Sequence, residues 1–271
     1  MPTRHVDTPN DPSIVAFLGL RDHAHRQIRE RPGGDQAGTF MAEGNVVIQR
    51  ALAAGHQLEA VLVDARRTAD LELPRDAQVL AASATVLEAV SGRPSLRDPI
   101  AMFTRPTLPD IGAVLEASRT VVVAEAVTNP VNMGVIARTA AALGIDALLV
   151  DPTSCDPLYR RAVRVSMGQV FAIPHVRLAG LPDGLTPLTD AGFELIALTP
   201  GDDADEMHTL TFGLDHKVAL LLGAEGPGLQ ASTMQRAHRR VAIPMARDVD
   251  SLNVASAAAI ACYAVQQARR G

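Results

Sequence analysis

The chain has 271 residues, enough for two domains that each bury their own core. Hydrophobic residues make up 47% and charged residues 20%, which indicates a globular protein and excludes a disordered one. The net charge of −5 argues against a protein that coats nucleic acid nonspecifically, but it leaves room for a local basic face. All but one of the 25 basic residues are arginine, whose planar guanidinium group suits phosphate.

The two cysteines, Cys155 and Cys262, lie far apart and have no His or Cys neighbours at metal-ligand spacing. They indicate neither a disulfide framework nor a zinc site. Residues 1–7 lack the apolar core of a signal peptide, and no apolar run approaches the roughly 20 residues of a membrane span. We therefore expect a cytoplasmic protein without a membrane segment or a metal.

The first hundred residues alternate helical and extended patterns. An amphipathic helix is predicted over 12–30, ended by the glycine pair at 33 and 34. The next elements are predicted to be a strand over 39–44, a helix over 46–54 capped by Asn45 and stopped by Gly55, strands over 58–64 and 78–82, a short helix over 85–90 and a strand over 99–103. This pattern is typical of a small α/β domain over 1–105.

Basic residues gather on the predicted first helix, at Arg21, Arg26, Arg29 and Arg31. They are a candidate phosphate-contacting surface, and a merely solvated helix face is an equally good interpretation for any one of them.

A proline-containing linker over 106–119 leads into a second α/β domain over 120–271. Its predicted elements are a buried strand over 120–124, a polar turn over 128–134, a helix over 135–143, a strand over 145–150, a helix over 158–170, a strand over 171–176, a helix over 185–191, strands over 194–198, 218–222 and from 241, and a helix over 254–270. This alternation favours a parallel sheet with helices on both faces. The last helix is apolar around most of its circumference, which indicates cover by a partner surface such as another subunit.

Two loops in the last third are expected to face one ligand. The strand over 220–222 runs into a turn with Gly223, Gly226 and Gly228, which let the backbone approach a ligand or adopt positive φ. Among the polar side chains, those placed to reach the ligand from these loops are Glu225, Ser251 and Asn253. The order of the glycines and Pro227 argue against a dinucleotide fingerprint, and no G-x-S-x-G elbow is present.

Three segments together resemble the SpoU (TrmH) family of RNA ribose methyltransferases in the SPOUT superfamily. They are the Asn-Pro-Val-Asn-Met-Gly turn with Arg138 over 129–140, the Gly-Ala-Glu-Gly-Pro-Gly turn within 222–229, and the Ile-Pro-Met and Ser-Leu-Asn run over 243–254. They stand in the family's order and spacing. Many members have glycine after Ile-Pro-Met, where this chain has Ala246-Arg247-Asp248. The segment 40–54 also resembles the amino-terminal RNA-binding domain of many members, which is similar to ribosomal protein L30e.

The resemblance implies a fold and an assembly. Residues 120–271 would form the catalytic SPOUT domain, with a parallel sheet and a deep trefoil knot built from the last two loops and the final helix. Residues 1–105 would form a smaller L30e-like domain that binds the RNA substrate. Members form homodimers, which agrees with the apolar final helix.

The resemblance also implies the cofactor, S-adenosylmethionine. By position, its adenosyl group would be held at Leu198, Thr199, Gly223, Ile243, Met245 and Leu252. Small and apolar residues suit these positions because adenine needs a dry slot and a few backbone amide partners.

The resemblance implies that Arg138 is the central catalytic residue, and in the family this arginine often comes from the other subunit. Either it acts as the base, or it clamps phosphate and lowers the pKa of the ribose hydroxyl, as the high pKa of arginine favours. The remaining polar site positions are Asn132, Glu225, Ser251 and Asn253. Each has a structural alternative: Asn132 caps a helix, Glu225 braces the glycine turn, and Ser251 and Asn253 begin the last helix.

Further arginines form two groups. Each group has two interpretations: it lines an RNA groove, or it merely faces solvent. They are Arg160, Arg161 and Arg164 on one predicted helix, and Arg236, Arg239 and Arg240 later in the chain. We therefore expect an S-adenosylmethionine-dependent RNA 2'-O-methyltransferase, with 23S rRNA ahead of tRNA as substrate. The alternative is a noncatalytic RNA-binding protein that retains the fold.

Overall fold

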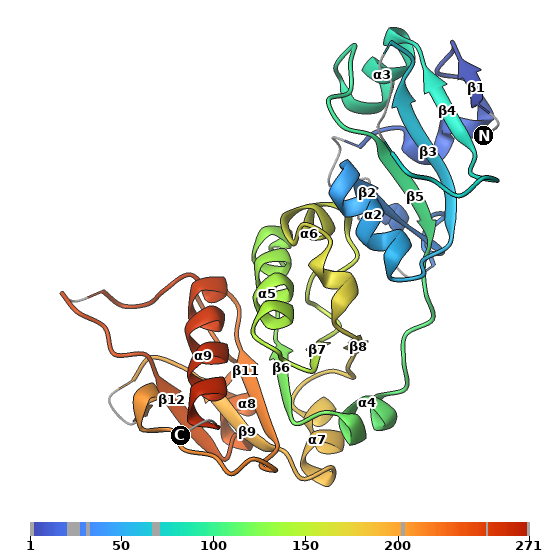
Figure 1. Cartoon of the computed structure of the whole chain (residues 1–271). Coiled ribbons are helices and arrows are strands. Elements are labelled where there is room, and N and C mark those ends of the chain that lie inside the picture. Colours follow the sequence, from blue (N-terminus) through green and yellow to red (C-terminus); the bar gives the residue numbers. More distant parts are fainter. Residues whose placement is uncertain are drawn as a thin grey trace. The chain divides into compact units, whose positions relative to one another are not determined.

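The computed structural model describes residues 3–20, 28–30, 33–66, 71–201, 204–247 and 249–269. They form two compact units (Figure 1). One combines residues 1–107 with 158–171, and the other combines residues 108–157 with 172–271. The predicted domains over 1–105 and 120–271 were continuous, whereas residues 158–171 pack with the first unit and the predicted linker over 106–119 is divided between the two units at residue 107.

The first unit is built on a five-stranded mixed sheet in the order β1-β4-β3-β5-β2. Its strands are β1 (Thr3–Val6), β2 (Thr39–Glu43), β3 (Leu58–Asp64), β4 (Val79–Ala82) and β5 (Ile100–Thr104). Strands β1 and β3 run parallel to β4, whereas β5 is antiparallel to both β3 and β2. The helices are η1 (Pro12–Phe17), α2 (Asn45–Ala53), α3 (Ala84–Ser91) and α6 (Arg160–Val165). The apolar sides of η1 and α3 complete a core that contains Phe17, Leu62, Leu80 and Leu87.

Two local predictions in this unit are wrong. The chain over 12–17 forms a short 3₁₀ helix, η1, whose N-cap Asp11 accepts a hydrogen bond from the Ser13 amide at 2.9 Å. It ends because Leu18 is extended and Gly19 has a φ of +69°. Arg21, Arg26 and Arg31 lie outside the described residues. Helix α2 begins one residue earlier than predicted, because Gly44, with a φ of +99°, occupies the N-cap position that we gave to Asn45.

The helix predicted over 158–170 is interrupted. Helix α6 ends at Val165, and Met167 and Gly168 have φ values of +55° and +77° before the 3₁₀ helix η2 (Gln169–Ala172). The segment is tied to the first unit through Arg50, whose Nη1 donates to the Met167 carbonyl at 2.6 Å, and through Phe171, whose ring centroid lies 5.5 Å from that of Phe40. These contacts explain why the segment leaves the continuous second domain.

The second unit contains a seven-stranded sheet in the order β10-β12-β9-β11-β6-β7-β8, and every pairing in it is parallel. The strands are β6 (Thr120–Ala124), β7 (Ala147–Val150), β8 (His175–Arg177), β9 (Glu194–Leu198), β10 (Asp205–Glu206), β11 (Val218–Leu222) and β12 (Arg239–Ala242). Every residue of β6, β7 and β11 is buried, as expected for strands covered on both faces. The predicted parallel sheet is confirmed.

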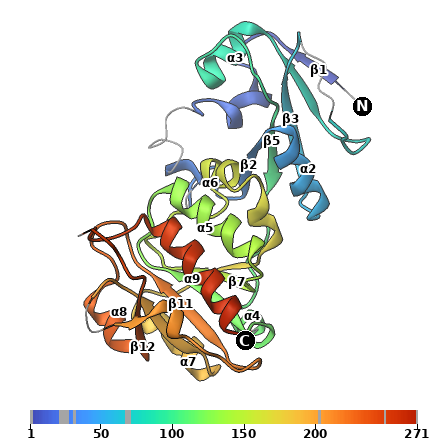
Figure 2. The same cartoon turned by 60° about the vertical axis from the view of Figure 1, so that its left-hand side comes forward.

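Helices cover both faces of this sheet. One core cluster joins alternate strand residues such as Val121, Leu195 and Leu221 to α4 (Ile111–Ala117) and α7 (Thr186–Asp190). Helices α5 (Pro130–Ala142) and α9 (Val254–Ala268) pack side by side (Figure 2) and contact β7 and β11. The remaining elements are α8 (Ala231–Arg236), η3 (Asp183–Leu185) and η4 (Met207–Thr209). Both cysteines are free, and burial raises the pKa of Cys262 on α9 to about 12.

Candidate active site

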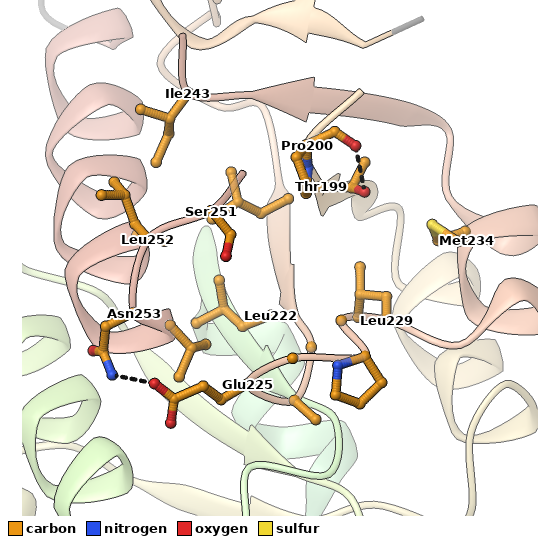
Figure 3. A pocket seen from close by; sticks show the side chains of 18 of the residues that line it. Thr199, Pro200, Leu222, Glu225, Leu229, Met234, Ile243, Ser251, Leu252 and Asn253 are labelled. Carbon is orange, nitrogen blue, oxygen red and sulfur yellow. Dashed lines mark hydrogen bonds between the residues drawn. The ribbon is translucent and has the colours of Figure 1, made fainter. Parts of the chain in front are cut away.

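A cavity of about 290 Å³ opens where β9, β11 and β12 end and α9 begins (Figure 3). These strands are parallel neighbours, so their carboxyl ends meet at one edge of the sheet, the usual place for a ligand in an α/β fold. All of the residues that we predicted to hold a cofactor line it: Leu198, Thr199, Gly223, Ile243, Met245 and Leu252. Further apolar lining comes from Leu222, Leu229 and Met234, which makes one wall of the cavity dry.

The glycine turn after β11 closes on itself. Ala224 and Gly228 exchange two backbone hydrogen bonds of 3.1 and 3.0 Å, and Gly226 and Gly228 have φ values of +91° and +73°. A Cβ atom on Gly223 would lie 2.1 Å from the Gly228 carbonyl carbon and from the Leu229 nitrogen. Gly223 is therefore required so that the turn can fold back against its own strand, which is a different reason from the ligand approach that the sequence indicated.

Three polar side chains from distant segments form a closed hydrogen-bonded group, which we call the amide–carboxylate triad. Asn132 donates from Nδ2 to Glu225 Oε2 at 3.0 Å. Asn253 donates from Nδ2 to Asn132 Oδ1 at 3.0 Å and to Glu225 Oε1 at 2.9 Å, and the last of these is drawn in Figure 3. The triad thus joins the start of α5, the glycine turn and the start of α9.

The triad decides between the structural roles that we weighed for its members. Asn132 does not cap α5, because Asn129 holds that position and accepts from the Val131 amide at 2.9 Å. Asn132 lies instead in the first turn and is 5% exposed. Asn253 does begin α9, since its Oδ1 accepts from the amides of Ala255 and Ser256 while its Nδ2 serves the triad. The hydrogen bonds to both carboxylate oxygens of Glu225 come from side chains outside the glycine turn, so they tie the turn to the starts of α5 and α9.

The other two predicted polar site residues, Ser251 and Arg138, lie in different places relative to the cavity. Ser251 lines the cavity and is exposed. Arg138 lies on α5, six residues beyond Asn132, and its exposed side chain does not line the cavity. Within one chain, the structure therefore assembles the predicted cofactor positions and the triad but leaves Arg138 apart from them.

The sequence analysis missed a buried carboxylate, Glu125, which follows β6 and is 1% exposed. Its oxygens accept hydrogen bonds from the Gln230 amide at 2.9 Å and from the Thr233 hydroxyl at 2.6 Å. It thereby fixes the start of α8 and the two cavity residues beside it, Leu229 and Met234. The signal was present as a single acid directly after the apolar run over 121–124.

A second buried acid, Asp151, ends β7 and fixes the turn before α5. Its Oδ1 accepts from the Ala126 amide at 3.0 Å and from the Ser154 amide at 2.8 Å. Burial on its own would raise the pKa of Asp151, but hydrogen bonds from Ser154, Thr153 and Ala126 outweigh it and hold the pKa below its usual value. Asp151 is therefore charged at neutral pH and holds a backbone turn.

Most of the other arginines that we predicted as possible RNA contacts form hydrogen bonds or ion pairs within the chain. Arg29 pairs with Asp35 at 2.8 Å, and Arg239 pairs with Asp205 at 2.8 Å. Arg236 donates to the Thr186 hydroxyl at 3.3 Å, whereas Arg161 is exposed. Arg160 and Arg164 both pair with Glu43 in the first unit.

The described part of the chain has neither a helix suited to span a membrane nor a cluster of metal ligands. None of its helices has the length and apolar character to cross a membrane. No three His, Cys, Asp or Glu side chains among the described residues are grouped so as to hold a metal ion.

Comparison with known proteins gives matches over nearly the whole chain. The model of the SpoU rRNA Methylase family matches residues 119–263, and that of the MRM3-like substrate binding domain matches residues 23–97. An uncharacterised tRNA/rRNA methyltransferase of Mycobacterium bovis is 40% identical over 95% of this chain and 90% of its own length. The 23S rRNA (guanosine-2'-O-)-methyltransferase RlmB of a Burkholderia species is 31% identical over 75% of this chain and 84% of its own. A crystal structure of an AdoMet-bound rRNA methyltransferase from Sinorhizobium meliloti has a TM-score of 0.78 at 25% identity and covers 98% of both chains.

The tight closure of the glycine turn generates a prediction. We expect Gly223→Ala to lower the free energy of unfolding by about 2 kcal/mol or more, because its methyl group would overlap backbone atoms that cannot withdraw. Gly213→Ala is the matched control in the same unit, since a Cβ atom there meets no atom within 4 Å, and it should change stability by about 0.5 kcal/mol at most. Equal urea unfolding midpoints for the two variants would contradict this role of Gly223.

Proposed function

Because the chain belongs to the SpoU rRNA Methylase family, it is an RNA methyltransferase, and we propose that it methylates a ribose 2'-hydroxyl of 23S rRNA with S-adenosylmethionine. The cavity at the ends of β9, β11 and β12, closed by the triad, is the observation that carries the proposal. The Burkholderia relative, named as a 23S rRNA 2'-O-methyltransferase, supports the substrate. The Mycobacterium bovis relative is named for both tRNA and rRNA, so tRNA is the second candidate.

The residues around the cavity fit S-adenosylmethionine. The apolar wall of Leu222, Leu229 and Met234 suits an adenine ring, and the lining residues Leu198 and Ile243 would offer backbone groups to its polar edge. Bound there, the cofactor would supply an electrophilic methyl group on a positively charged sulfur. Glu225 would stay a brace during the reaction, because both of its oxygens already accept amide hydrogen bonds.

Transfer of that methyl group would form a carbon–oxygen bond at the ribose as the carbon–sulfur bond breaks, and the hydroxyl proton would pass to water. The protein must stabilise the oxygen as negative charge develops on it. Arg138 suits this task as a clamp, since a guanidinium keeps its charge and can hold a phosphate beside the hydroxyl. Its exposed place on α5 supports a role toward RNA more than toward the cofactor.

We further propose a homodimer in which Arg138 of the partner subunit completes each site. Helix α9 buries one face within its own unit but leaves Ile260 and Tyr263 41% and 56% exposed on the other. Exposed apolar side chains of this kind suit a subunit contact. A dimer would also explain why Arg138 and the cavity are apart within one chain.

The finer features of the fold remain part of the proposal. We propose that the glycine turn, the loop after β12 and α9 form a deep trefoil knot, and that residues 1–105 are an L30e-like domain that binds the RNA. The match of residues 23–97 to a substrate binding domain supports the second point. We place the protein in the cytoplasm, where its RNA substrates are.

The direct test is a map of ribose methylation in total RNA from cells with and without the gene. One 2'-O-methyl group in 23S rRNA should disappear with the gene and return when the purified protein and S-adenosylmethionine are added to that RNA. Loss of a tRNA mark instead would move the substrate to tRNA. An unchanged map, together with RNA binding by the protein, would favour the noncatalytic alternative.

The role of Arg138 gives a second prediction. Arg138→Ala should slow single-turnover methyl transfer on the order of a hundredfold or more, the usual cost of losing one preorganised charge, while cofactor affinity stays within a few-fold. Arg138→Lys should restore little, because a point charge does not reproduce the guanidinium fork. Mixed dimers of Arg138→Ala chains and Leu252→Arg chains, whose cofactor cavity is blocked at an exposed lining residue, should regain activity if the arginine acts across subunits. Wild-type transfer by Arg138→Ala would contradict the assignment.

A further inference from the structure

The first unit contains a second cavity, of about 390 Å³, with a mainly polar lining. Four arginines contribute to it, Arg93 and Arg97 from the loop after α3 and Arg160 and Arg164 from α6. Its acidic lining residues are Glu43 and Asp98. The balance is therefore positive in a chain whose net charge is −5, which marks this cavity as a place for an anion.

The two arginines of α6 share one acid and have different exposures. Arg160 Nη1 lies 2.6 Å from Glu43 Oε2, and Arg164 Nη1 lies 3.0 Å from Glu43 Oε1. Arg160 also donates to the Leu20 carbonyl at 2.8 Å, and only 16% of its side chain is exposed. The side chain of Arg164 is 58% exposed. Arg160 is thus a structural partner of Glu43, whereas Arg164 has guanidinium donors left to offer a ligand.

The loop that carries Arg93 and Arg97 is held in place by a hydrogen bond from Arg66. Asp64, 4% exposed, accepts hydrogen bonds from Arg66 Nε at 2.9 Å and Nη2 at 2.8 Å. The same Arg66 Nη2 donates to the carbonyl of Pro94, between Ser91 and Arg97. The Arg66 guanidinium is the largest influence that holds the pKa of Asp64 below its usual value, so this support persists at neutral pH. A ligand would therefore meet Arg93 and Arg97 on a preorganised loop.

We propose that this arginine cavity binds a phosphodiester group of the RNA substrate, an inference that rests on the proposed function. Guanidinium groups recognise phosphate oxygens through paired donors, and the volume accommodates a phosphate with its sugar. Among the described residues, no aromatic side chain lines the cavity for a base to stack on. The cavity therefore positions the RNA backbone and leaves the choice of nucleotide to other contacts.

The test measures RNA affinity of the full-length protein on a 23S rRNA fragment that contains the mapped nucleotide, over a series of salt concentrations. Arg93→Ala and Arg164→Ala should each weaken binding about fivefold to tenfold, and each should reduce the slope of log affinity against log salt by about one. Glu43 keeps Arg160 as a partner in Arg164→Ala, so the fold should persist. Arg75→Ala, an exposed arginine of the same unit outside the cavity, is the matched control and should bind RNA as the wild type does.

The outcomes separate this proposal from the proposed function. Wild-type RNA affinity and salt slope in both variants would overturn it, and so would an equal loss in Arg75→Ala. Calorimetry with inorganic phosphate distinguishes a free-anion site: phosphate binding that Arg93→Ala abolishes, with RNA affinity unchanged, would also overturn the RNA assignment. If the wild type transfers no methyl group, and the two variants still bind RNA more weakly than it does, the role of the cavity is upheld and the proposed function is overturned instead.

Discussion

The site depends on one interaction, the closed hydrogen-bonded triad of Asn132, Glu225 and Asn253. Its members come from three segments that are far apart in the chain, the first turn of α5, the glycine turn and the N-cap of α9. The carboxylate of Glu225 accepts two amide donors, and hydrogen bonds to a charged group are stronger than those between neutral groups. The triad therefore sets where the glycine turn stands relative to the first turn of α9, and those two segments form much of the cavity wall.

Two other features make this arrangement rigid. Gly223 allows the turn to fold back against its own strand, and Glu125 holds the chain at Gln230 as it leaves the turn. The turn is thus anchored at its start, its middle and its end. Cofactor recognition by backbone groups requires such rigidity, because amides in a mobile loop would lose part of their binding free energy in becoming ordered.

The sequence predicted much of this architecture, because apolar runs such as 120–124, 194–198 and 218–222 become buried parallel strands with the expected bounds. It failed where a tertiary contact or a backbone conformation overrides local pattern. Helix α5 starts at Pro130, because proline suits the first position of a helix. Asn132 therefore lies in the triad and not at the cap position that we predicted for it. The break near Gly168 was hidden by an apolar and basic pattern that suits one continuous helix. The sequence predicted that Asn132, Glu225 and Asn253 share a site. It did not predict the hydrogen bonds between them, because these depend on the three-dimensional arrangement.

The central claim, that the triad holds the cofactor cavity in shape, is tested most directly by calorimetric titration of S-adenosylmethionine into the wild type and Asn132→Ala. Asn132 does not line the cavity, so its effect on binding must pass through Glu225 and Asn253. We expect one cofactor per wild-type chain and an affinity about tenfold or more lower in Asn132→Ala, in line with the loss of two hydrogen bonds of which one is charge-assisted. Equal affinity in a folded Asn132→Ala protein would contradict it.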